Sequence, residues 1–75
     1  MASETTKLKA LAKNIQMARK NKNLSQNQLA DILDISREHL AKIETARRCV
    51  SLSLLFQIAE VIGVSEKELF DFAEL

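Results

Sequence analysis

Apolar residues recur along the chain at steps of three and four positions, the spacing that places side chains on one face of an α-helix. The first such stretch covers residues 5–21, and we expect it to form a helix that ends near Asn23, a residue that tolerates left-handed backbone angles. Its apolar stripe consists of Leu8, Leu11, Ala12, Ile15 and Ala18. No strand-like alternation competes with this pattern, so the sequence predicts an all-α protein.

Serine residues mark the starts of the next two predicted helices. Ser25 precedes Gln28 by three positions, the capping-box spacing, which predicts a second helix over residues 26–33. The following three residues are expected to form a turn, whose last member, Ser36, can cap a third helix from 37 to about 45. Two short amphipathic helices joined by a three-residue turn are typical of a helix-turn-helix, here at about residues 25–45.

The last third of the chain predicts two more helices. Ser51 can cap a fourth helix that Gly63 ends, and Ser65 with Glu68 has capping-box spacing at the start of a fifth. The apolar stripe of the fourth helix consists of Leu54, Leu55, Ile58, Ala59 and Ile62, and the fifth helix carries Leu69, Phe70 and Phe72. We therefore expect residues 1–75 to form one compact domain of five helices, with the first few residues disordered.

The predicted third helix has an apolar side and a charged side. Leu40 and Ile43 share one side, and the opposite arc carries Arg37, Glu38, Ala41, Lys42 and Thr45. Arg and Lys can donate hydrogen bonds to guanine O6 and N7, whereas Glu can accept one from the cytosine amino group. We therefore predict that Arg37, Glu38 and Lys42 read DNA bases. The alternative is that they are ordinary solvated charges.

Residues around this helix have positions suited to backbone phosphates. Gln26 is in the first turn of the second helix, where exposed amide groups and the helix dipole favour an anion. Arg47 and Arg48 follow the third helix, although solvation alone would also explain them. The predicted phosphate-binding residues are Gln26, Ser36, His39, Arg47 and Arg48. For His39 the alternative is packing against the turn.

Arg19 occupies the apolar stripe of the first helix, where an unpaired guanidinium would be costly to bury. Glu44 lies on the core-side flank of the third helix, and we predict a structural ion pair between the two side chains. Such a pair would fix the third helix against the first. The alternative is that Arg19 extends to solvent at the helix end.

The chain has 75 residues and a net charge of only +1, but its charges are unevenly distributed. Residues 1–48 contain ten Lys and Arg against five Asp and Glu, whereas residues 49–75 contain one Lys against five acidic residues. One part of the molecule can thus present a positive surface while the other repels phosphate.

The composition argues against several other classes of protein. His39 is the only histidine and Cys49 the only cysteine, so we expect no metal site, and we interpret Cys49 as a reduced core or boundary residue. The sequence contains no nucleophile paired with a base, no pair of carboxylates and no phosphate-binding glycine loop. We therefore expect no enzyme, no cofactor and no small-molecule ligand. The chain lacks an apolar run that would indicate secretion or a membrane span, so we expect a cytoplasmic protein.

The combination of these motifs resembles the Cro/cI-type helix-turn-helix family, also called XRE, which includes phage repressors and restriction-modification controller proteins. The resemblance covers about residues 11–72, through LSQNQLADILDIS, the adjacent Ile43 and Glu44, and the tail SLSLLFQIAEVIGVSEKELF. It implies a lambda-repressor-like fold, and the Arg-x-x-Leu start of the third helix is slightly closer to controller proteins. The resemblance also implies that Gln26 binds a backbone phosphate and that Arg19 pairs with Glu44. It further implies that Arg37, Glu38 and Lys42 face the DNA groove.

Family members form homodimers through their last helices, and these homodimers bind pseudo-palindromic operators. The resemblance therefore implies a dimer interface in this region, for which we expect Val64, Leu69, Phe72 and Leu75. The chain departs from the family pattern at Asp34 and Ala46, where glycine is usual, and at Val50, where proline is usual. Ala46 predicts either a rearranged loop or a third helix extended by one turn.

These features predict a sequence-specific, DNA-binding transcription regulator that occludes a promoter or contacts RNA polymerase. Double-stranded DNA and a second copy of the chain are the expected partners, and no membrane is. An alternative from another class is a protein-interaction module or antitoxin-like protein that retains the fold and binds a toxin. A steep loss of DNA affinity with rising salt would distinguish the regulator from this alternative.

Overall fold

Five helices follow one another in the computed structural model, which describes residues 2–72. They are α1 (Glu4–Asn21), α2 (Gln26–Leu33), α3 (Arg37–Glu44), α4 (Leu52–Ile62) and α5 (Glu66–Leu69). Residues 2–72 contain no strand, so the predicted all-α fold is confirmed. The predicted bounds of the first four helices agree with the structure to within one residue.

A serine side chain caps the N-terminus of every one of these helices. The caps are Ser3, Ser25, Ser36, Ser51 and Ser65, and each hydroxyl oxygen accepts a hydrogen bond from the backbone N–H three residues later. At α2 the predicted capping box is complete, because the Gln28 side chain accepts from the Ser25 N–H at 2.8 Å. Ser3 was not predicted as a cap, and its hydroxyl oxygen accepts a hydrogen bond from the Thr6 N–H at 3.1 Å.

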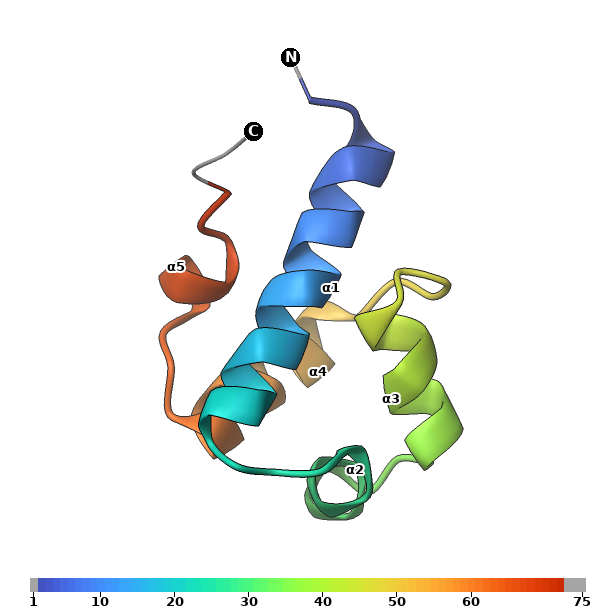
Figure 1. Cartoon of the computed structure of the whole chain (residues 1–75), viewed down its shortest axis with the longest axis vertical. Helices are drawn as coiled ribbons and strands as arrows, with labels where there is room; N and C mark the ends of the chain where they lie inside the picture. Colours follow the sequence, from blue (N-terminus) through green and yellow to red (C-terminus); the bar gives the residue numbers. More distant parts are fainter. Residues whose placement is uncertain (1, 73–75) are drawn as a thin grey trace.

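The helices enclose one apolar core, with α1 between the other elements. Figure 1 shows α1 in front of α4, with α3 to its right, α5 to its left and α2 below. The buried apolar side chains include Leu11, Ile15, Leu29, Leu33, Leu40, Ile43, Leu55, Ile58, Ile62 and Leu69. All helices contribute to this core, so it fixes α2 and α3 against α1 and α4.

The last helix is shorter than the apolar pattern suggested. It ends at Leu69, and Phe70 follows as its C-cap. The Asn14 side chain donates hydrogen bonds to the carbonyl oxygens of Leu69 at 2.9 Å and Asp71 at 3.0 Å, which holds this segment on α1. The prediction that the helix includes Phe70 and Phe72 is therefore wrong.

One residue predicted to form the dimer interface is buried within the protomer. Leu69 is 1% exposed and belongs to the core, so its assignment to a dimer interface is wrong. Val64 and Phe72 are half-buried and pack against the same core. Leu75 lies outside the described residues.

Within residues 2–72, three residues other than glycine have left-handed backbone angles, and each follows a helix. They are Asn23, Asp34 and Ala46, with φ of 62°, 57° and 59°. Ala46 adopts the left-handed angles that a glycine usually provides after a helix. The Arg47 N–H then donates to the Lys42 carbonyl at 2.9 Å. The alternative of a third helix extended by a turn is therefore wrong.

Candidate nucleic-acid interface

The turn between α2 and α3 sets the direction in which α3 leaves. Asp34 adopts left-handed angles at the C-cap of α2, and the Ile35 N–H donates to the Ala30 carbonyl at 3.0 Å. Ile35 packs against the core, and Ser36 then caps α3. The structure thus contains the predicted helix-turn-helix, with a capped helix on each side of a three-residue turn.

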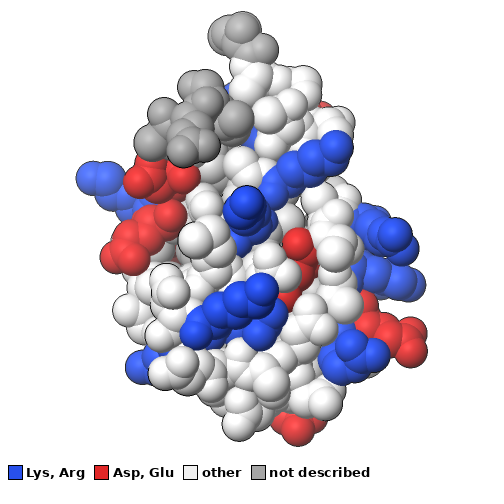
Figure 2. Space-filling view, viewed as in Figure 1, with Lys and Arg blue, Asp and Glu red and all other residues white. Residues whose placement is uncertain are grey.

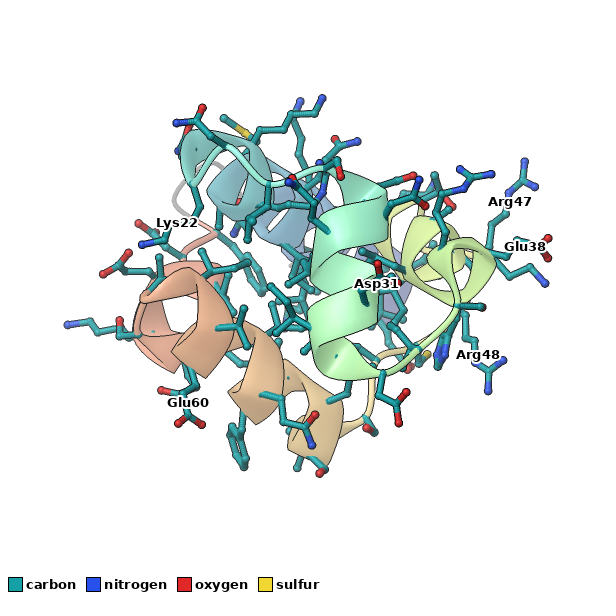
Figure 3. The ribbon with its side chains drawn as sticks, turned by 90° about the horizontal axis from the view of Figure 1, so that it is seen from below. Lys22, Asp31, Glu38, Arg47, Arg48 and Glu60 are labelled. Atoms are coloured by element: carbon teal, nitrogen blue, oxygen red, sulfur yellow. The ribbon has the colours of Figure 1, made fainter. Side chains whose placement is uncertain are left out.

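The two sides of α3 differ as the sequence predicted. Leu40 and Ile43 are 0% and 2% exposed and pack into the core. Arg37, Glu38 and Lys42 are exposed, and Figure 3 shows Glu38 at the outer edge of the molecule. The outer face of α3 therefore presents donors of hydrogen bonds beside an acceptor, the combination needed to distinguish base edges.

A buried ion pair joins the end of α3 to α1. The Arg19 Nε donates to Glu44 Oε2 at 2.7 Å and Nη2 donates to Oε1 at 3.0 Å, a bidentate arrangement. Arg19 and Glu44 are 6% and 5% exposed, and the remaining guanidinium nitrogen donates to the Leu24 carbonyl at 2.8 Å. The predicted ion pair is present, and the alternative in which Arg19 extends to solvent is wrong.

Gln26 is a third member of this network, which the sequence did not predict. Its Nε2 atom donates to Glu44 Oε1 at 3.0 Å, so the start of α2 is tied to the end of α3. The two residues are 18 positions apart on different helices, and no spacing rule links them. Gln26 also carries one of the first backbone N–H groups of α2, which point out of the helix towards any bound anion.

The other predicted phosphate-binding residues surround α3. Arg47 and Arg48 are exposed in the loop after α3, and Figure 3 shows both at the same edge as Glu38. His39 is half-buried, and its backbone N–H donates to the Ser36 hydroxyl oxygen at 2.9 Å. Arg47 and Arg48 therefore lie on the same side of the molecule as Glu38 on the exposed face of α3.

Cys49 lies beyond these arginines and is exposed. The prediction that it belongs to the core is wrong, but it lies at the boundary of the core, because it lines a small cavity with Leu11 and Ile43. No group of three or more metal-binding side chains occurs within residues 2–72. In the same part of the chain, no helix is sufficiently long and apolar to cross a membrane.

Charge is distributed over the surface as the sequence suggested. Figure 2 shows Lys and Arg side chains over α1 and along the side of α3, with single acidic side chains among them, whereas Asp and Glu side chains gather on the side of α5 beside a basic one. A polyanion would therefore be attracted to the side that carries α1 and α3 and repelled by the side that carries α5.

Comparisons with known proteins agree with this geometry. A family profile described as Helix-turn-helix matches residues 15–69. The control protein C.BamHI of Bacillus amyloliquefaciens is 38% identical over 53 residues, covering 71% of this chain and 65% of that protein. The control protein C.SmaI of Serratia marcescens is 37% identical over 59 residues, covering 79% and 70%. The crystal structure of the restriction-modification controller protein C.AhdI from Aeromonas hydrophila matches with a TM-score of 0.79 and 28% identity, covering 84% of this chain and 96% of that chain.

Proposed function

The chain belongs to the helix-turn-helix family of DNA-binding transcription regulators, and we propose that it acts in the cytoplasm as a homodimer on a pseudo-palindromic operator. The observation that carries this proposal is the outer face of α3, where Arg37, Glu38 and Lys42 are exposed while Leu40 and Ile43 anchor the helix. These three side chains read base edges in the major groove.

The residues around α3 hold the DNA backbone. Gln26 and the start of α2 bind a phosphate on one side of the groove, and Arg47 and Arg48 bind phosphates on the other. Ser36 and His39, at the first turn of α3, contribute further contacts. The hydrogen bond from Gln26 to Glu44 supports this arrangement, because it keeps the phosphate site of α2 in a fixed position relative to α3.

We infer dimerisation from the small size of the DNA interface that one protomer offers. One recognition helix reads too few base pairs for useful specificity, and two copies related by twofold symmetry read two half-sites. Phe70 is 45% exposed directly after α5, and Phe72 packs edge-on against it with ring centroids 6.1 Å apart. We propose that Phe70, together with Val64 and Phe72, forms the contact between protomers.

The names of the relatives suggest the process that is regulated. Two relatives are control proteins, and the matching crystal structure is of a restriction-modification controller protein. We therefore propose that this chain controls transcription of restriction-modification genes, by occluding a promoter or contacting RNA polymerase.

Selection of binding sites from a randomised pool of duplex DNA tests the proposed function. We expect enrichment of an inverted repeat whose half-sites are separated by about one helical turn, roughly 10 base pairs. Enrichment of a single, non-repeated site would contradict the homodimer. A chain that retains no duplex even at low salt would favour the protein-interaction alternative over the regulator.

A further inference from the structure

We propose that a row of lysines on α1 binds DNA phosphates beside the segment contacted by α2 and α3. The α1 lysine stripe consists of Lys9, Lys13 and Lys20, all of which are exposed. This inference rests on the proposed function, because it extends the same DNA interface onto a helix outside the helix-turn-helix.

The spacing of the three lysines places them on one line along α1. At 100° per residue their side chains fall within an arc of about 40°, and at 1.5 Å per residue they span about 16 Å of the helix axis. Duplex DNA carries one phosphate charge per about 1.7 Å of its axis, so a stripe of this length faces several phosphates.

Two contacts show on which flank of α1 the stripe lies. Asn14 reaches α5 from one flank of the apolar face of α1, through its bonds to the carbonyl oxygens of Leu69 and Asp71. The α1 lysine stripe falls on the other flank of that face, away from α5. In Figure 2, Lys and Arg side chains lie across the front of α1 and others lie along the side of α3, with an acidic side chain between the two groups. The stripe therefore lies on the face of α1 that is turned away from α5.

The charges of the stripe are available for an anion. Within residues 2–72, Arg19 and Glu44 form the one ion pair, so none of the three lysines is neutralised by a described acidic side chain. The stripe starts at the end of α1 that leads into α2, where Gln26 is proposed to bind phosphate, and runs along α1 away from that point. One DNA strand that contacts the start of α2 thus continues over α1.

A pair of charge-matched variants tests this inference. The stripe variant carries Lys9→Gln, Lys13→Gln and Lys20→Gln. The control variant carries Lys7→Gln, Lys22→Gln and Lys67→Gln, and it loses the same charge from other exposed positions. Lys22 lines a cavity with Val64 and Glu68, and Figure 3 shows it on the opposite side from Glu38 and Arg47. Gln and Lys have similar helix propensities, so both variants should fold.

Fluorescence anisotropy with a random-sequence duplex of about 40 base pairs, roughly four helical turns, gives the affinity at several salt concentrations. We expect the plot of log K against log salt to become less steep in the stripe variant by about one unit per lysine lost. The control variant should keep the slope of the unmodified chain, and a stripe variant with Arg at all three positions should recover it.

Three outcomes separate the two proposals. Equal slopes for the stripe variant and the unmodified chain overturn the stripe while leaving the proposed function intact. Equal reductions in the stripe and control variants also overturn it, because they indicate a general effect of net charge. Failure of the unmodified chain to bind the duplex contradicts the proposed function itself. Thermal unfolding of each variant confirms that the comparison is made between folded proteins.

Discussion

Ala46 adopts a left-handed backbone conformation, which costs an L-amino acid with a β-carbon about 1–2 kcal/mol. The chain accepts this cost because the turn completes α3, with the N–H groups of Arg47 and Arg48 both donating to the Lys42 carbonyl. The family's usual glycine would reach the same angles without strain. The loop thus keeps its shape with an unfavourable residue.

Replacing this alanine should stabilise the protein. We expect Ala46→Gly to raise the free energy of unfolding by about 1 kcal/mol, the relief of strain minus the entropy that glycine adds to the unfolded chain. Urea unfolding measures the change. Ala10→Gly, inside α1, is the matched control and should lower the same free energy by about 1 kcal/mol. A loss of stability in both variants would contradict the strain at Ala46.

Individual residues also show what the sequence could and could not predict. The pair between Arg19 and Glu44 was predictable, because a guanidinium in an apolar stripe requires an anion. The contact of Gln26 with Glu44 was not, since it depends on how three helices meet in space. The exposure of Cys49 was missed for a related reason: the path of its loop follows from a backbone angle at Ala46 that residue type alone does not favour.

At the level of elements, helix starts were easier to predict than helix ends. A serine hydroxyl that accepts a backbone N–H three residues later is a local signal, visible in the sequence. The end of α5 instead depends on Asn14, which is 55 residues away in the chain and bonds to the Leu69 carbonyl. For the same reason the sequence could not show that Leu69 belongs to the protomer core rather than to a surface.

Ser36 has an observed role as a helix cap and a proposed role at a phosphate, and substitution can separate the two. Its hydroxyl caps α3, so Ser36→Ala should lower the free energy of unfolding by about 1 kcal/mol. Ser36→Asp retains a cap and should restore stability, but its carboxylate should weaken DNA binding by repelling the neighbouring phosphate. Thermal unfolding and fluorescence anisotropy measure the two effects. Unchanged DNA affinity in Ser36→Asp would show that this position faces no phosphate.

At the scale of the whole molecule, the uneven charge distribution was visible in the sequence, and Figure 2 shows its result on the folded surface. The proposed dimer contact was less accessible to sequence analysis. Apolar residues near the C-terminus can serve either the core or an interface, and only the fold shows that Leu69 is buried while Phe70 is exposed.

The proposed dimer can be tested at Phe70. A charge at the centre of an apolar contact is costly, so we expect Phe70→Glu to convert the dimer to a monomer in sedimentation equilibrium. Ile32→Glu places the same charge at an exposed apolar residue of α2 and should leave the dimer intact. A dimer that persists in Phe70→Glu would show that the protomers meet elsewhere.

The central claim is that the outer face of α3 reads bases. The most direct test measures the affinities of Arg37→Ala and Arg48→Ala for the selected operator and for its single-base variants. Loss of Arg37 should relax discrimination at one base pair of each half-site by about 1–3 kcal/mol, whereas loss of Arg48 should weaken binding to all sequences equally. An unchanged preference at every position in Arg37→Ala would contradict the account.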